Sequence, residues 1–298
     1  MAVLPSQLAM VLLVKNEIDI IELNIRFHAR MGVSQFLVMD NGSTDGTLEC
    51  LKTLQKEFKI IIVENPTGVY QQSKWMTELI RQAKTAFGAT HVIPNDADEF
   101  WVPTGFNSLP EQTFADSSMQ SIHRYNRVLT KELIATEGNY WSSPYIVESP
   151  IMYSGETQKF KPNISMQLVK ISPKVIVKPK GLIKIKGGNH RARHWQFWTK
   201  ANNPNITVHH FPIRSWQQFL TNIKNRQNIL DKPNVKMGPH YRRWVKQLYE
   251  NVLTNEFEQL TPTQQQVNAL LEIGVLEQED RLPLILAECA KECQDLRN

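Results

Sequence analysis

The chain has 298 residues, of which 41% are hydrophobic and 21% charged, and its formal net charge is +5. This composition excludes a disordered chain and leaves room for one large α/β domain or one domain with an appendage. The longest apolar runs, residues 8–14 and 59–63, are too short to span a bilayer. The first nine residues lack the charge and cleavage site of a secretory signal, so we expect a cytoplasmic protein, with contact to the inner face of a membrane as a further expectation.

Strand and helix patterns alternate over the first 94 residues. Apolar runs predict strands at residues 8–14, 36–39, 59–63 and 91–94, and helical spacing predicts helices at residues 18–31, 48–54 and 70–87. This alternation indicates βαβ units and therefore an α/β fold with a mostly parallel sheet flanked by helices.

The pattern changes after Trp101. Shorter strands are expected at residues 121–125, 165–170, 174–177 and 182–186, and helices at residues 214–230, 241–253, 262–273 and 282–296. We expect the last helices to form a packed C-terminal cap rather than a separate domain.

Two carboxylates, Asp96 and Asp98, directly follow the fourth predicted strand. Residues i and i+2 at a strand end point to the same side, so both carboxylates can reach one hard divalent cation. A solvated acidic exit from the strand is the alternative interpretation.

Polar clusters also follow the first two strands: Lys-Asn-Glu at residues 15–17 and a dense turn sequence at residues 40–47. In open α/β sheets, ligands bind at the carboxyl ends of the strands. Each cluster alone also suits an ordinary turn or helix start, but three at one predicted sheet edge favour a single site.

Acidic residues are missing between residues 157 and 230, while the same segment holds fourteen lysines and arginines. Such a segment suits an anionic partner: a nucleotide diphosphate, a phospholipid or an acidic polymer. Nucleic acid is disfavoured, because the lysines alternate with Val and Ile as in strands with one solvated face, and no nucleic-acid-binding motif accompanies them.

The three polar clusters resemble those of family 2-type glycosyltransferases of the GT-A fold. The resemblance is greatest to a bacterial subgroup with a Lys-Asn-Glu motif, here residues 15–17, and an Asp-x-Asp-Glu-Phe run, here residues 96–100. It covers residues 8–104, and a His-rich strand at residues 208–215 extends it. It implies a glycosyltransferase domain over residues 1–230, with a nucleotide half at 1–104 and an acceptor half at 105–230, followed by a helical extension at 231–298.

The resemblance also implies the activity. The protein would use Mn²⁺ or Mg²⁺ to move one sugar from a UDP- or GDP-sugar to a glycan, lipid or small-molecule acceptor, with inversion. A bound cation neutralises the charge that develops on a nucleotide diphosphate leaving group. The Gln-x-x-Arg-Trp motif of processive enzymes is missing, since residues 191–195 differ from it, and this favours a single transfer.

Site residues carry over by position. The residues implied near the nucleotide are Asn16, Glu17, Asp40, Asp45 and Asp96. Asp98, with Asp96, would hold the metal. A late-strand histidine is a recurrent further ligand in this fold, and His210 is the candidate; packing beside Phe211 and Trp216 is its alternative role.

The catalytic base is left open. The family's usual Glu-Asp pair has no counterpart here, because the segment where it would fall has no carboxylate. An inverting transfer needs a base for the acceptor hydroxyl. The candidates are His190, Glu137, Glu148 and Glu156.

Two other functions compete with glycosyl transfer. A sugar nucleotidyltransferase would share the sheet and a metal carboxylate, but the Gly-rich phosphate loop that should follow its first strand is absent. A catalytically inactive nucleotide-sugar-binding module stays open because the family's base motif is missing.

Overall fold

The computed structural model describes residues 7–65, 71–136, 139–152, 165–230 and 239–295. The chain divides into two units. The first comprises Met1–Arg124, Ser172–His209 and Cys289–Asn298, and the second comprises Tyr125–Ile171 and His210–Glu288. These units do not follow the boundary expected at residue 230, and a glycosyltransferase domain over residues 1–230 stays a prediction.

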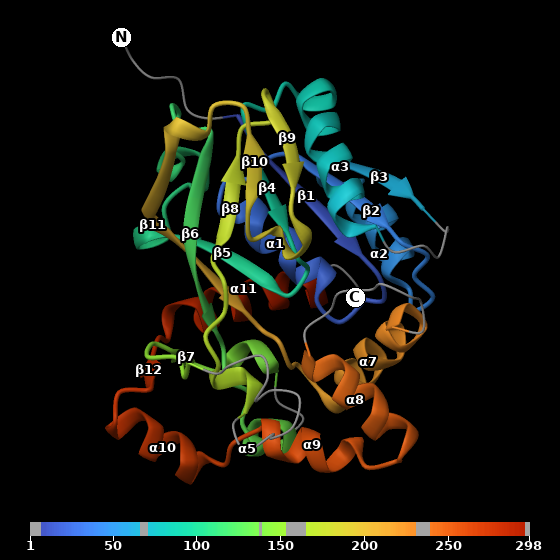
Figure 1. The fold of residues 1–298 in the computed structure, drawn as a ribbon, viewed down its shortest axis with the longest axis vertical. Coiled ribbons are helices and arrows are strands. Elements are labelled where there is room, and N and C mark those ends of the chain that lie inside the picture. The colour runs from blue at the N-terminus through green and yellow to red at the C-terminus, as the bar shows by residue number, and fades with distance from the viewer. Residues whose placement is uncertain (1–6, 66–70, 137–138, 153–164, 231–238, 296–298) are drawn as a thin grey trace. The chain divides into compact units, whose positions relative to one another are not determined.

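The first unit is built on an eight-stranded sheet in the order β3-β2-β1-β4-β8-β6-β11-β5 (Figure 1). Its strands are β1 (Leu8–Val14), β2 (Phe36–Asp40), β3 (Ile60–Glu64), β4 (His91–Asn95), β5 (Glu99–Pro103), β6 (Met119–Asn126), β8 (Lys174–Val177) and β11 (Lys200–His210). Strands β1 to β4 are parallel, and β8 pairs antiparallel with both β4 and β6. The predicted α/β fold with a mostly parallel sheet is confirmed.

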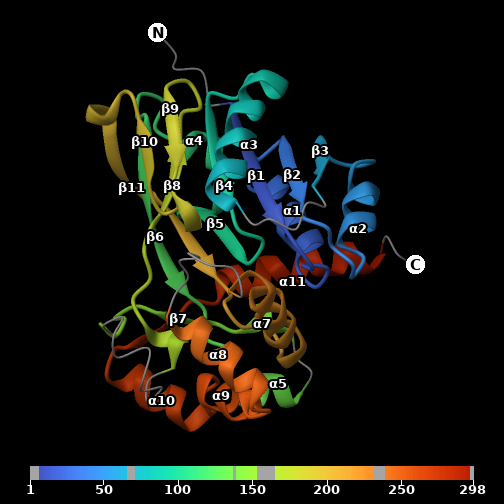
Figure 2. The same cartoon turned by 45° about the vertical axis from the view of Figure 1, so that its right-hand side comes forward.

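Helices cover both faces of the parallel strands. Helices α1 (Ile21–Arg30), α2 (Thr47–Leu54) and α3 (Gln72–Phe87) connect β1, β2, β3 and β4 in turn. Right-handed crossovers from β1 to β2 and from β2 to β3 place α1 and α2 on one face of the sheet. The connection from β3 to β4 runs back across the sheet in the opposite direction, so α3 lies on the other face (Figure 2). Ala9 and Val11 of β1 lie in the core under α3, together with Trp75 and Leu79 of that helix.

Two sequence expectations in this unit differ from the structure. Strand β5 was not expected, because its first residue belongs to the acidic cluster, yet its remaining sequence, Phe-Trp-Val-Pro, is apolar and buried. Residues 165–170 form no strand; Met166–Leu168 is a single 3-10 turn instead. A small hairpin, β9 (Leu182–Ile185) with β10 (Ala192–His194), packs beside α3.

The second unit is mainly helical. Its helices are α5 (Lys131–Ala135), α7 (Trp216–Leu230), α8 (Pro239–Tyr249), α9 (Leu253–Leu260) and α10 (Gln264–Glu272), and most of α11 (Arg281–Asp295) belongs to it. Strands β7 (Tyr145–Val147) and β12 (Leu276–Gln278) pair antiparallel. The helix expected at residues 241–253 ends at Tyr249, close to Asn251, whose φ of 57° interrupts a helix. That these helices form a cap packed on the expected catalytic domain stays a prediction.

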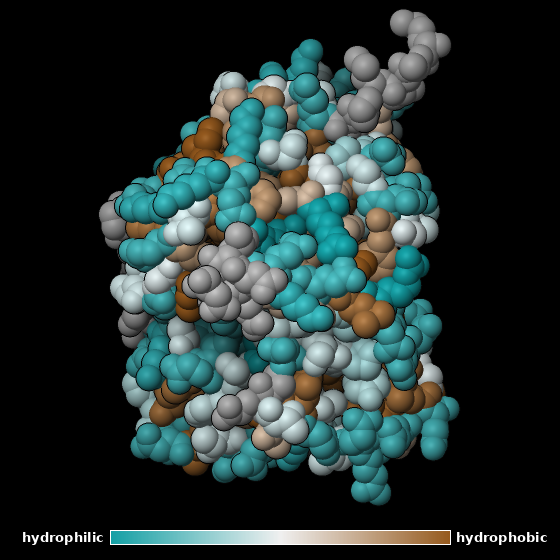
Figure 3. All heavy atoms as spheres, turned by 180° about the vertical axis from the view of Figure 1, so that it is seen from behind, coloured by the Kyte–Doolittle hydropathy of each residue, from teal (hydrophilic) through white to brown (hydrophobic). Residues whose placement is uncertain are grey.

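Hydrophilic residues cover most of the face in Figure 3, and hydrophobic residues reach it in small separate groups. Among the described residues, no helix combines the length and the apolar character that crossing a bilayer requires.

Candidate functional site

The loops after β1 and β2 are tied together by hydrogen bonds. Asn16 has a left-handed φ of 56°, which asparagine tolerates better than most residues. Its backbone N–H donates to the Ser43 hydroxyl over 2.9 Å, and its side-chain oxygen accepts the Thr44 N–H over 2.8 Å. This exchange holds the first loop against the second at the carboxyl ends of two parallel strands.

Asp45 supplies the rest of this connection. One carboxylate oxygen accepts the Ile18 N–H at 3.1 Å, and the other accepts the N–H and the hydroxyl of Thr47 at 3.0 and 2.6 Å. The Glu17 N–H donates to the same hydroxyl over 2.9 Å. Both oxygens of Asp45 are therefore used within the chain, where they position the loop that carries Asn16 and Glu17.

Asp40 is different, because only half of its buried carboxylate is used. It ends β2, between Val14 of β1 and Glu64 of β3. Its Oδ2 accepts the N–H groups of Gly42 and Ser43, both at 3.0 Å, whereas its Oδ1 has no partner among the described residues. The buried side-chain oxygen of Asn41 also lacks one. Buried oxygens without donors are rare in proteins, so these two mark a place for a ligand that donates hydrogen bonds.

The acidic motif forms the tight turn between β4 and β5. The side chain of Asn24 in α1 donates to the carbonyls of Ala97 and Glu99, at 2.8 and 2.9 Å. The Trp101 N–H donates to Nε2 of His28 over 3.0 Å, and His28 Nδ1–H in turn donates to the Asn24 carbonyl. Burial lowers the pKa of His28 to about 3, so the ring stays neutral in this arrangement. Helix α1 thus fixes the backbone that presents Asp96 and Asp98.

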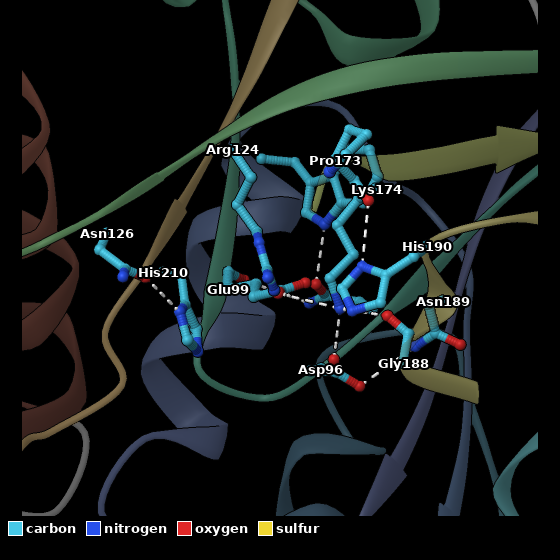
Figure 4. A network of polar contacts seen from close by, with 12 residues as sticks. Asp96, Glu99, Arg124, Asn126, Pro173, Lys174, Gly188, Asn189, His190 and His210 are labelled. Atoms are coloured by element: carbon cyan, nitrogen blue, oxygen red, sulfur yellow. Dashed lines mark hydrogen bonds and ion pairs between the residues drawn. The ribbon is translucent and has the colours of Figure 1, made fainter. Parts of the chain in front are cut away.

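Lys174, fully buried on β8, lies between two carboxylates of this motif (Figure 4). Its ammonium pairs with Asp96, lies 2.9 Å from Glu99 Oε1 and donates to the Gly188 carbonyl over 2.9 Å. Asn189 donates to the other oxygen of Asp96 over 3.1 Å. Both oxygens of Asp96 therefore already have partners in the chain.

Glu99 is the fully buried member of the acidic motif. Arg124 of β6 donates to its Oε1 over 2.6 Å, and its Oε2 has no partner among the described residues. Lys174 and Arg124 together balance two of the three carboxylates at residues 96–99. Asp98, which is half-buried, is the third carboxylate of this turn.

His190 lies beside this network in the first unit. Its Nδ1–H donates to the Pro173 carbonyl over 3.0 Å, which leaves the lone pair on Nε2. Burial, together with the nearby charges of Lys174 and Arg124, lowers its pKa to about 4. The ring is packed against Gly188, whose φ is +74° and where a Cβ would come within 2.6 Å of it. His190 is thus a neutral imidazole with low basicity.

Two of the other candidate residues, His210 and Glu148, lie in the second unit. His210 ends β11 and belongs to the second unit, where its Nδ1–H donates to the Asn126 side chain over 2.8 Å. Its role as a metal ligand stays a prediction. Glu148 is exposed in the second unit and hydrogen-bonds Tyr125, whose pKa burial raises. Glu137 and Glu156 lie outside the described residues.

Four polar residues of this site were not assigned roles from the sequence: Lys174, Arg124, Glu99 and Asn189. Lys174 opens a Val-Ile-Val strand and was expected to be solvated, because nothing local in the sequence shows that a strand's lysine points inward. The available signal was Glu99, since a buried third carboxylate beside Asp96 and Asp98 requires a cation from elsewhere in the chain.

No family model matches this chain, and no curated protein matches it. Solved structures show a partial likeness of fold. Residues 1–349 of TarS from S. aureus, in complex with UDP-GlcNAc, are 11% identical with a TM-score of 0.42, over 88% of this chain and 74% of that one. Glucosyl-3-phosphoglycerate synthase from Mycobacterium tuberculosis, in complex with Mn²⁺, UDP and glucosyl-3-phosphoglycerate, is 15% identical with a TM-score of 0.35, over 75% and 77%.

Proposed function

We propose that this protein is a glycosyltransferase that moves one sugar from a nucleotide-diphospho-sugar to an acceptor, with a divalent metal and with inversion. The single observation that carries the proposal is the buried, unpartnered oxygen of Asp40 at the carboxyl end of β2. It lies in the parallel sheet whose β4 leads into the turn with Asp96 and Asp98. The proposed site for a hydrogen-bond donor at Asp40 and the proposed cation site at Asp96 and Asp98 would then lie at the same edge of the sheet.

Asp40 suits the base of the nucleotide. A carboxylate oxygen only accepts hydrogen bonds, so its partner must carry an N–H or O–H group. The ring N–H of uracil or guanine satisfies this requirement, in agreement with a UDP- or GDP-sugar. Asn16 and Glu17, on the loop that Asp45 holds against Asp40's loop, complete the proposed nucleotide pocket.

The carboxylates of the β4–β5 turn suit a divalent cation, which prefers oxygen ligands. Asp98 is the proposed principal ligand, with Asp96 as the further ligand. Bound Mn²⁺ or Mg²⁺ would neutralise the negative charge that develops on the diphosphate leaving group.

Lys174 supplies a positive charge to the same acidic turn. Its buried ammonium keeps Asp96 and Glu99 from repelling each other. Asn24 and His28 hold the turn that carries these carboxylates, so the site is organised before a donor arrives.

The base that takes the proton from the acceptor hydroxyl is proposed to be one of the four candidates. His190 is unprotonated at neutral pH, but its low pKa makes it a weak base. Glu148 is exposed, and it contacts Tyr125. Activity of the variants His190→Gln and Glu148→Gln, measured from pH 3 to 9, would show which substitution removes the acidic limb, where protonation of the base lowers the rate.

The direct test is donor hydrolysis and transfer. Purified protein is incubated with Mn²⁺ and a panel of UDP- and GDP-sugars, and the released nucleoside diphosphate is measured. We expect turnover with one donor class, a loss of about 10²-fold or more in Asp98→Asn, and no loss in the exposed control Asp116→Asn.

Two results would contradict the proposal. Unchanged activity in Asp98→Asn would remove the metal assignment. Tight nucleotide binding without release of diphosphate, with every donor and acceptor offered, would show the inactive binding module instead.

A further inference from the structure

Three large aromatic side chains are exposed together in the turn between β10 and β11. Trp195, Phe197 and Trp198 are 73%, 70% and 64% exposed. They belong to the first unit, and we call residues 195–198 the aromatic turn. Ile183 of β9, in the hairpin that leads into this turn, is a fourth exposed apolar side chain, at 46%. Exposed apolar groups this close together indicate an interaction surface.

The turn is held in this conformation by its backbone. The Gln196 N–H donates to Nδ1 of His194 over 3.0 Å, and the Gln196 carbonyl accepts the Ser118 hydroxyl over 2.6 Å. The Ser118 N–H reaches the Thr199 carbonyl over 3.2 Å, and the Trp195 N–H reaches that of Gly181 over 2.9 Å. The aromatic side chains are thus presented outward by an anchored turn.

Positive charge surrounds the aromatic turn. Strand β10 alternates, so that Ala192 and His194 point inward while Arg191, Arg193 and Trp195 are exposed. Other exposed cations of the same segment are Lys180, Lys184, Lys186 and Lys200. Arg193 pairs with Lys184 across the hairpin, which puts two like charges side by side. Such a pair is unfavourable unless an anionic surface faces it.

We propose that the aromatic turn and the cations of the β9–β10 hairpin form a docking surface for an anionic membrane. Trp is enriched at the boundary between lipid headgroups and acyl chains, and exposed Lys and Arg are attracted to anionic headgroups. A second copy of this chain is disfavoured as the occupant, because it would bring two sets of cations together. Phe197 and Trp198 meet edge to face, at 5.3 Å and 77°, which forms an apolar wedge rather than the parallel faces on which successive bases stack.

The experiment is co-sedimentation of the full chain with vesicles of phosphatidylcholine alone or with 30% phosphatidylglycerol. We expect binding to the anionic vesicles that weakens as salt rises. The variant W195A/F197A/W198A should bind at least about tenfold more weakly, because it loses the apolar wedge. The variant R191Q/R193Q should lose roughly fivefold for each charge removed.

Matched control variants distinguish binding through this surface from nonspecific binding to vesicles. Y249A/I273A/L284A removes three other exposed apolar side chains, and K52Q/K246Q removes two other exposed cations; both should bind like the wild type. The urea midpoint should be unchanged in the aromatic variant, since the substituted groups are exposed. Headgroup-proximal brominated lipids should quench the tryptophan emission of the wild type, and W195F/W198F should lose that quenching.

Three results would overturn the proposal. The wild type could fail to bind anionic vesicles, or the control variants could lose as much binding as the aromatic variant. Alternatively, polyphosphate or single-stranded DNA could bind with a dependence on the three aromatic residues that vesicles do not show, and a soluble polyanion would then be the partner. None of these results bears on donor hydrolysis, so the docking surface and the proposed activity are tested independently.

Discussion

Asp40 and Asp45 stand five positions apart in one loop, and their identical side chains serve different purposes. Both oxygens of Asp45 accept hydrogen bonds from the chain, whereas Asp40 keeps one buried oxygen without a donor. The sequence placed both near a nucleotide, because a dense turn cluster shows where ligands gather but not which side chain the turn itself needs. That distinction depends on backbone N–H directions, which only the folded loop determines.

Asp40→Ala should weaken nucleotide binding by about 10- to 100-fold, because a hydrogen bond to a charged acceptor is lost. Asp45→Ala should instead lower the free energy of unfolding by about 1–3 kcal/mol, because it releases N–H groups that hold two loops together. Calorimetric titration with UDP or GDP and Mn²⁺, alongside urea unfolding, measures both effects. The reverse pattern, with Asp40→Ala binding normally, would contradict the assignment of the base pocket.

The sequence predicts the burial of Lys174 poorly, yet its side chain pairs with two carboxylates at the site. Lys174→Met leaves Asp96 and Glu99 without their shared cation, so we expect a loss of about 3–5 kcal/mol in the free energy of unfolding. The double variant Lys174→Met/Glu99→Gln removes the buried charge as well and should recover part of this loss. Equal losses in the single and double variants, by urea unfolding, would show that the ion pair does not set the stability here.

At the scale of elements, hydrophobic pattern was sufficient for the first four strands and three helices, which fall within a few residues of their expected bounds. It was insufficient for β5, because an acidic cluster masked the first residue of a buried strand. The strand expected at residues 165–170 was wrong, since its short apolar stretch packs as a single turn. Patterns of four to six residues do not distinguish a strand from a buried turn.

The link between α1 and the β4–β5 turn predicts a pH dependence. The pKa of His28 is about 3 in the folded protein, below its ordinary value of 6.5. The unfolded chain therefore binds a proton below pH 6.5 while the folded protein does not, and stability is lost as pH falls from 6.5 towards 3. Between pH 7.5 and 5 this amounts to about 2 kcal/mol.

Urea unfolding at pH 7.5 and pH 5 tests this link. His28→Gln should be less stable than the wild type at pH 7.5 and should lose less stability on going to pH 5. The exposed control His123→Gln should keep the wild-type difference. An unchanged pH difference in His28→Gln would show that other buried histidines, such as His91, dominate it.

At the scale of the whole molecule, the charge pattern of the sequence was informative but incomplete. The segment without acidic residues predicts an anionic partner, yet one of its lysines, Lys174, is buried in the candidate site, while others surround the aromatic turn. Burial depends on which strands become neighbours, and β8 lies between β4 and β6 only because the chain returns to the sheet. Composition therefore predicts that an anion binds but not how the cations divide between sites.

The second unit contains its own buried charge contact. Arg127 donates to the Ser143 and Glu279 carbonyls, at 3.1 and 2.9 Å, and pairs with the Glu279 carboxylate. Arg127→Met removes these bonds between distant parts of the chain and leaves their acceptors unsatisfied, so we expect about 3–5 kcal/mol of destabilisation. Hydrogen exchange should increase at residues 143–147 and 276–280. Exchange that increases equally at residues 8–14 of the first unit would contradict a local role.

Pairing of β7 with β12 joins positions about 130 residues apart in the chain. During synthesis at about 5–20 residues per second, β7 would wait roughly 7–26 s for its partner strand. Over that time Val128, Val147 and Leu168 lack Val267 and Leu276, the later members of their hydrophobic cluster. The nascent second unit therefore exposes part of its hydrophobic cluster until Leu276 is synthesised, and its folding should depend on translation speed more than that of the first unit's early strands, whose partners emerge soon after them.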